Sequence, residues 1–199
     1  MIKRKIITLL VSFASLVYEF TLSYIMSILY GGLVKQYILT IGIYIFGLGI
    51  GSLFYEIYKQ RIKLSIVELT LTILGCLSIA VPIFIFEHFY FSHFFNLLYI
   101  FSIAFLSGIE LPALMDERED SLTILGMDYL GMALASLLFP FLLLPHLGIA
   151  YTLLLTGGVN FICVLCLNEK FKFKSVSIIS VLGILIFSAT LNMQELLLK

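Results

Sequence analysis

Long apolar segments follow one another along almost the whole chain, with short polar breaks between them. A helix crosses a bilayer core about 30 Å thick with about 20 apolar residues. Segments of that length are residues 6–29, 37–57, 64–86, 94–115, 121–145, 147–167 and 175–195. Because the breaks are short, neighbouring helices are expected to run antiparallel. The pattern predicts an all-α, polytopic membrane bundle of about seven transmembrane helices, with residues 1–199 forming one domain.

The composition also indicates a membrane protein. Hydrophobic residues make up 61% of the chain and charged residues 12%, whereas a typical soluble domain has about 25% charged residues. The first apolar run starts at Ile6 and is longer than the core of a secretory signal, so we expect it to remain as the first span. The formal net charge is zero, and no basic stripe predicts nucleic acid as a partner. The expected surroundings are the lipid bilayer.

Basic residues divide unequally between the two sides of this arrangement. Those on the side of the N-terminus are Lys3, Arg4, Lys5, Lys59, Arg61, Lys63, Arg118, Lys170, Lys172 and Lys174. Only Lys35 and Lys199 fall on the other side. Cytoplasmic loops carry the excess of Lys and Arg. The pattern therefore predicts a multi-pass protein of the plasma (inner) membrane, with a cytoplasmic N-terminus and an external C-terminus.

Carboxylates lie inside segments that otherwise suit lipid. A charged side chain near the bilayer centre costs about 2.5–3.5 kcal/mol by insertion scales, and such residues are usually turned inward and functional. From the rise of a helix, Glu68, Glu110, Asp128 and Asn160 fall at similar depths in the cytoplasmic half, and Glu19 lies nearer the midplane. This coincidence of depth predicts one inward-facing site.

Prolines are expected to break two spans beside these carboxylates. Pro112 follows Glu110 closely, and Pro140 and Pro145 lie downstream of Asp128. A proline removes a helix hydrogen bond. Interrupted membrane helices are places where transporters hold cations. The alternative is an ordinary kink beside a carboxyl group that bonds to a neighbouring helix.

The carboxylates are not expected to be equivalent. Glu56 and Glu68 lie close to the interface, so packing or interfacial roles are favoured for both. Function is favoured for Glu19, Glu110 and Asp128, because their depth makes them costly.

Small residues predict how some helices pack. The second span carries Gly42, Gly47, Gly49 and Gly51, with a GxxxG pattern at Gly47 and Gly51, and a packing face is the favoured interpretation for these glycines. In the first span, Ser15, Glu19 and Ser23 share one face.

Motifs for catalysis or for a tightly bound cofactor are missing from the sequence. The cysteines lie in apolar segments, and the histidines lack the spacing of a zinc site. There is no nucleophile elbow, HExxH or P-loop pattern. We therefore expect no cofactor, no metal and no catalytic residues, and an intramembrane enzyme is the least favoured class.

A series of short motifs resembles a known family. They are Val17-Tyr18-Glu19, Gly47-Leu-Gly-Ile-Gly51-Ser52, Val67-Glu68, Gly108-Ile-Glu110-Leu-Pro112, Asp128-Tyr129-Leu130-Gly131, Phe139-Pro140 through Gly148, and Thr156-Gly-Gly-Val-Asn160. Their order resembles the membrane domain that precedes the catalytic domain in membrane-bound spermidine synthase-like proteins (polyamine aminopropyltransferases). That family carries a glycine- and aspartate-rich loop in its soluble domain, and nothing in residues 1–199 matches it. The expectation is that this polypeptide is not an enzyme by itself.

The first function expected is that of a stand-alone membrane module that binds or transports a small organic cation such as a polyamine. Glu19, Glu110 and Asp128 would bind the ammonium groups, with Asn160 as a neutral partner. The expected secondary residues are Glu68, Tyr18 and Tyr129.

The alternative function is a non-catalytic membrane anchor or scaffold. It would dock a separate cytoplasmic aminopropyltransferase through the acidic loop 116–120 and the basic loop 170–174. The buried carboxylates would then serve only helix packing.

Overall fold

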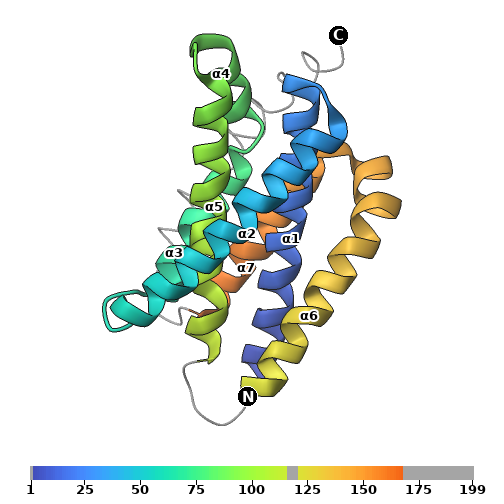
Figure 1. Ribbon diagram of the computed structural model, residues 1–199. Helices are drawn as coiled ribbons and strands as arrows, with labels where there is room; N and C mark the ends of the chain where they lie inside the picture. The colour runs from blue at the N-terminus through green and yellow to red at the C-terminus, as the bar shows by residue number, and fades with distance from the viewer. Residues whose placement is uncertain (1, 116–120, 168–199) are drawn as a thin grey trace.

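The helix α1 (Ile2–Tyr30) is the element around which the others are arranged, and it contacts α2, α4, α5, α6 and α7. The computed structural model describes residues 2–115 and 121–167. In chain order the other elements are α2 (Leu33–Tyr58), α3 (Leu64–Cys76), α4 (Ala80–His88), α5 (Ser92–Met115), α6 (Ser121–Leu138), the π-helix η1 (Phe139–Leu147) and α7 (Gly148–Leu167). Figure 1 shows α6 along one side of α1 and α5 on the other, with α2 crossing α1 obliquely. Every regular element of the described residues is a helix, so the predicted all-α class is confirmed.

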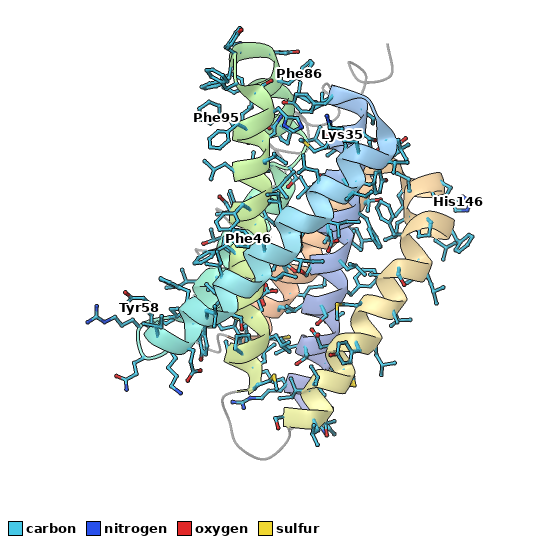
Figure 2. The ribbon with its side chains drawn as sticks, in the orientation of Figure 1. Lys35, Phe46, Tyr58, Phe86, Phe95 and His146 are labelled. Carbon is cyan, nitrogen blue, oxygen red and sulfur yellow. The ribbon has the colours of Figure 1, made fainter. Side chains whose placement is uncertain are left out.

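Four helical stretches of the described residues are long and apolar enough to cross a membrane. They are α1, α2, α5 and the continuous stretch Ser121–Leu167, and a fifth is added if α3 and α4 count as one bent span. Phe46 on α2 is 60% exposed and Phe95 on α5 is 38% exposed, and Figure 2 shows both on the outside of the bundle. Apolar side chains on the outer faces suit lipid. The number of crossings and the orientation of the N-terminus stay predictions, and the expected span at 175–195 lies outside the described residues.

The stretch Ser121–Leu167 reverses direction at Gly148. The first part runs parallel to α1, because Asp128 contacts Ser12 and Phe139 contacts Phe20 farther along the same helix. Gly148 has φ 69° and ψ −179°, a backbone conformation that is essentially restricted to glycine.

The second part, α7, runs antiparallel to α1. Cys163 packs with Ile7 near the start of α1, whereas Leu153 packs in the same cluster as Leu22 and Ile25 near its end. The two parts of the stretch therefore lie on either side of a sharp turn, as expected from the separate apolar segments 121–145 and 147–167.

The segment 64–86, expected as one straight span, is bent by 59° between α3 and α4. Pro82 explains the bend, because it has no N–H to bond to the carbonyl of Ser78 and its ring clashes with that carbonyl. At the bend, the Leu74 carbonyl accepts hydrogen bonds from the Tyr99 hydroxyl of α5 at 2.6 Å and from the Ser78 hydroxyl at 3.0 Å. Side chains thus satisfy the backbone at the bend.

The expected proline interruptions differ between the two spans. The helix α5 continues without a break through Pro112 to Met115, so the break expected there is not present. After α6, the chain widens into η1, which contains Pro140 and Pro145. A π-helix accommodates the missing N–H groups without ending the helical path.

The predicted glycine packing face is confirmed between α2 and α5. A Cβ on Gly51 would collide with the carbonyl oxygen of Phe105, and a Cβ on Gly108 would collide with that of Leu48. For Gly42 and Gly49 the prediction of a packing face is wrong, because a Cβ added at either position would have no neighbouring atom within 4 Å. The close approach brings α2 and α5 together along the wall of the cavity described next.

Candidate functional site

A cavity of about 190 Å³ lies between α1, α2, α5 and α6. Its lining is mostly apolar, but it includes two carboxylates, Glu110 and Asp128. The full lining consists of Thr8, Val11, Ser12, Ser15, Leu48, Ser52, Ser107, Gly108, Glu110, Leu111, Pro112, Leu114, Asp128 and Met132. We call this cavity the carboxylate pocket.

The two carboxylates of the pocket differ in exposure. Glu110 on α5 is 2% exposed, whereas Asp128 on α6 is half-buried. The Ser12 hydroxyl from α1 is hydrogen-bonded to Asp128 Oδ1 and lies 2.8 Å from the carbonyl oxygen of Thr8. Asp128 therefore lies on the accessible side of the pocket, and Glu110 lies in the interior.

Glu68 on α3 lies behind the pocket and faces Glu110. Its side chain is completely buried, and its carboxyl group is close enough to that of Glu110 for a direct interaction. Both oxygens of Glu68 and Oε1 of Glu110 nevertheless have no well-formed hydrogen bond from a described residue. Buried polar atoms almost always have partners, so this pair is the main unsatisfied feature of the interior.

Hydroxyl and amide groups surround the pair. The Tyr18 hydroxyl interacts electrostatically with Glu68 and Glu110. It accepts a 3.4 Å hydrogen bond from Asn160 Nδ2 on α7. On the other side, the Tyr44 hydroxyl of α2 donates to the carbonyl oxygen of Ser15 at 2.9 Å. Five helices, α1, α2, α3, α5 and α7, thus contribute polar groups to one interior region beside Asp128 of α6.

Within the described residues, the charges of these carboxyl groups are not balanced by a basic side chain. The groups that interact electrostatically with Glu68, Glu110 and Asp128, or form hydrogen bonds with them, are carboxyl and hydroxyl groups. None of these described groups belongs to a Lys, Arg or His. A buried carboxylate is costly without a cation or sufficient hydrogen bonds. The arrangement is suited to receiving a positive charge from outside the protein.

The structure brings together most of the residues expected at the site. Glu110 and Asp128 line the pocket, and Asn160 reaches the same region through Tyr18. Glu68, for which an interfacial role was favoured, is instead fully buried beside Glu110. Its depth along the helix did not reveal that its side chain points into the bundle interior.

Three other residues considered in the sequence analysis do not line the carboxylate pocket. Glu19 is 7% exposed and interacts electrostatically with Tyr44, but it does not line the pocket. Tyr129 is 60% exposed on the outer face of α6, so the structure places it away from the pocket. Glu56 is exposed and lies 3.8 Å from the Lys59 ammonium group, which agrees with its expected interfacial role.

Sequence reasoning missed Ser12, Tyr44 and Ser107. Each lies in a largely apolar helix, and only the packing shows that all three face the carboxylates. Thr8, Ser12 and Ser15 on one side of α1 were the available signal, because spacings of three and four residues share a helix face.

Groups of three or more His, Cys, Asp or Glu side chains arranged to hold a metal are absent from residues 2–115 and 121–167. Cys76, Cys163 and Cys166 are free thiols.

Comparison with known proteins gives a consistent set of relatives. The polyamine aminopropyltransferase of Leptospira interrogans is 32% identical over 161 residues, which cover 76% of this chain and 32% of that protein. Polyamine aminopropyltransferase 2 of Aquifex aeolicus is 29% identical over 174 residues, which cover 81% of this chain and 35% of that protein. The polyamine aminopropyltransferase of Oceanobacillus iheyensis is 29% identical over 163 residues, which cover 76% of this chain and 32% of that protein. No protein-family model and no solved structure matches the chain.

These relatives support the resemblance to spermidine synthase-like proteins. The chain spans about a third of the length of the curated relatives it matches. The similarity connects the matched region with proteins that are named polyamine aminopropyltransferase.

The comparisons also correct one expectation. The prediction that this protein is not an enzyme is wrong, because the relatives that match about three quarters of the chain are named for an aminopropyl-transferring enzyme. The prediction rested on motifs missing from residues 1–199, and a missing motif is weaker evidence than similarity along most of the chain. A separately encoded aminopropyltransferase partner stays a prediction, and the docking loops 116–120 and 170–174 lie outside the described residues.

Proposed function

We propose that this chain is a membrane-embedded, cation-binding part of the polyamine aminopropyltransferase system, and that the carboxylate pocket binds a polyamine. The polyamine would be a substrate or a product of the aminopropyl transfer for which the relatives are named. The chain would lie in the plasma (inner) membrane with its N-terminus in the cytoplasm.

The observation that carries the proposal is the pairing of acidic groups with no basic partner inside an apolar cavity. Glu110 and Asp128 line the pocket, and no described Lys, Arg or His acts on either carboxyl group. Ammonium groups form strong, charge-assisted hydrogen bonds with carboxylates. A bound cation would therefore supply a positive charge that the described residues do not provide at this place.

The lining of the pocket favours a linear amine over a small inorganic ion. Val11, Leu111 and Met132 line it together with the carboxylates. A polyamine carries ammonium groups separated by methylene chains, so apolar walls would contact the methylene groups while carboxylates bind the charged ends. Asp128 at the accessible side and Glu110 in the interior would bind different ammonium groups.

Equilibrium dialysis tests the proposal. The full chain in lipid nanodiscs is dialysed against labelled spermidine, and unlabelled 1,4-diaminobutane or acetate is added as competitor. The expected result is retention of spermidine that the diamine displaces and acetate does not. Retention no greater than that of empty nanodiscs would overturn the proposed function. The variant E56Q is the matched control, because Glu56 is exposed and lies beside Lys59.

A further inference from the structure

We propose that the carboxylate pocket exchanges a proton for its cation: an ammonium group that binds at Glu110 displaces a proton held by the buried pair Glu68–Glu110. The inference rests on the proposed function, since it concerns how the same pocket binds its ligand. Its consequence is that the affinity for the cation depends on pH, and that cation binding and proton release are linked.

The first argument is the charge balance of the pair. Glu68 is completely buried and Glu110 is 2% exposed, and their carboxyl groups interact directly. Two adjacent carboxylates in a poorly hydrated interior repel one another, so such a pair retains a proton unless a cation is present. Three of their four oxygens have no well-formed hydrogen bond from a described residue, so the described residues do not replace the missing hydration.

The second argument concerns the groups that face the pair from each neighbouring helix. They are Tyr18 on α1, Tyr44 on α2, Asp128 on α6 and Cys163 on α7, with the neutral Asn160 bonded to Tyr18. Phenols and thiols are weaker acids than carboxyl groups, so they do not provide a positive charge or accept the proton. Glu19 reaches the region only through its interaction with Tyr44 and adds a further acidic group. No described side chain that acts on the pair is basic.

The third argument is a route for the released proton. Glu110 and Asp128 line the same pocket and act on one another electrostatically, and Asp128 is half-buried. The Ser12 hydroxyl has one proton and two partners, Asp128 and the carbonyl oxygen of Thr8. It donates to Asp128 when that carboxyl is ionised, and it accepts from Asp128 and donates to Thr8 when that carboxyl is protonated. Asp128 therefore keeps a partner in both states and is suited to pass the proton to water.

The exchange is balanced in atoms and charge. A protonated ammonium group enters, and the O–H bond of the protonated carboxyl in the pair breaks. The electron pair of that bond stays on the carboxylate, which binds the ammonium ion, and the proton leaves to water. No oxidant, reductant or further reactant is required. Because binding releases a proton, a rise in pH favours binding.

Isothermal titration calorimetry tests the inference on the full chain in nanodiscs. Spermidine is titrated at one pH in two buffers with different ionisation enthalpies, phosphate and Tris, and the difference between the observed heats gives the number of protons released. The expected value is about one proton per cation bound, with affinity rising up to about tenfold per pH unit where the pair is protonated.

The outcomes separate this inference from the proposed function. Binding with equal observed heats in phosphate and Tris, and with no dependence on pH, would overturn the proton exchange and leave cation binding intact. No binding in either buffer would overturn the proposed function and the exchange with it. Proton release that is the same in E56Q as in the wild type is expected, because Glu56 lies outside the pocket.

The variant E68Q locates the source of the proton. Glutamine keeps the shape of the side chain, removes the acidic neighbour and provides an amide N–H for the ionised Glu110. We expect spermidine affinity within about tenfold of the wild type, clearly fewer protons released and a flatter dependence on pH. Undiminished proton release in E68Q would show that the pair is not the source.

Discussion

Glu68 on α3 and Glu110 on α5 bring their carboxyl groups together in the interior of the bundle, next to a pocket that Asp128 borders on its accessible side. The pair and Asp128 form a series that leads from the buried interior towards the surface. No described basic side chain acts on them, and this observation is the basis for proposing that the region binds a cation from solution. The predictions below test the parts of this arrangement separately.

Replacing Ser12 by alanine removes the side chain that bonds to Asp128. Hydrogen bonds to charged groups contribute about 1.5–3 kcal/mol, so S12A is expected to weaken spermidine binding about tenfold or more. Calorimetry measures the change. The control is S136A, because Ser136 is exposed on α6 and bonds only to the carbonyl of Ala133. Equal affinities for S12A and the wild type would show that Ser12 does not position Asp128.

The α2–α5 contact depends on the absence of a side chain at Gly51. A Cβ there would collide with the carbonyl oxygen of Phe105, so G51A is expected to lower the free energy of unfolding by about 1–3 kcal/mol. Equilibrium unfolding in mixed micelles measures the loss. The matched control is G49A, because no atom lies within 4 Å of the added Cβ at Gly49. Similar losses for both variants would contradict the packing described here.

Tyr18 provides the hydroxyl that accepts the amide of Asn160. The variant Y18F leaves this buried amide without its acceptor, and such a loss costs about 1–3 kcal/mol. Unfolding in the same micelles is expected to show that decrease. Y129F is the control and should be within about 0.5 kcal/mol of the wild type, because Tyr129 is exposed. A Y18F protein as stable as Y129F would show that the contact with Asn160 contributes little.

The predicted orientation is testable by chemical labelling. In a background with Cys76, Cys163 and Cys166 replaced by alanine, single cysteines are placed at Lys35 and Arg61. The excess of basic residues on the side of Arg61 predicts that this side is cytoplasmic. In intact spheroplasts an impermeant maleimide should label K35C and should label R61C only after permeabilisation. Labelling of R61C in intact spheroplasts would reverse the orientation.

Most of the fold could be predicted because it depends on long apolar segments and on glycines that allow close contact. The helix bounds and the α2–α5 contact at Gly51 follow from patterns within single segments. The bend between α3 and α4 was missed, although Pro82 was a visible signal in the sequence. A proline by itself does not decide whether a helix bends, because α5 continues through Pro112 without a break.

The candidate site could be predicted only in part, because depth along a helix does not determine which way a side chain points. Glu110 and Asp128 were expected together and both line the pocket. Glu68 had the right depth but was assigned to the interface, whereas Tyr129 is adjacent in sequence to Asp128 and points outward. Helix rotation and tilt result from packing between helices, and a single sequence does not specify them.

The central claim is that Glu110 and Asp128 bind a cationic amine. The most direct measurement is the equilibrium affinity for spermidine of the E110Q/D128N double variant in nanodiscs, compared with the wild type and with E56Q. Loss of two charge-assisted contacts predicts a decrease of at least about a hundredfold, in a protein that remains folded as judged by its helical circular dichroism. E56Q should bind as the wild type does. Wild-type affinity in the double variant would contradict the account.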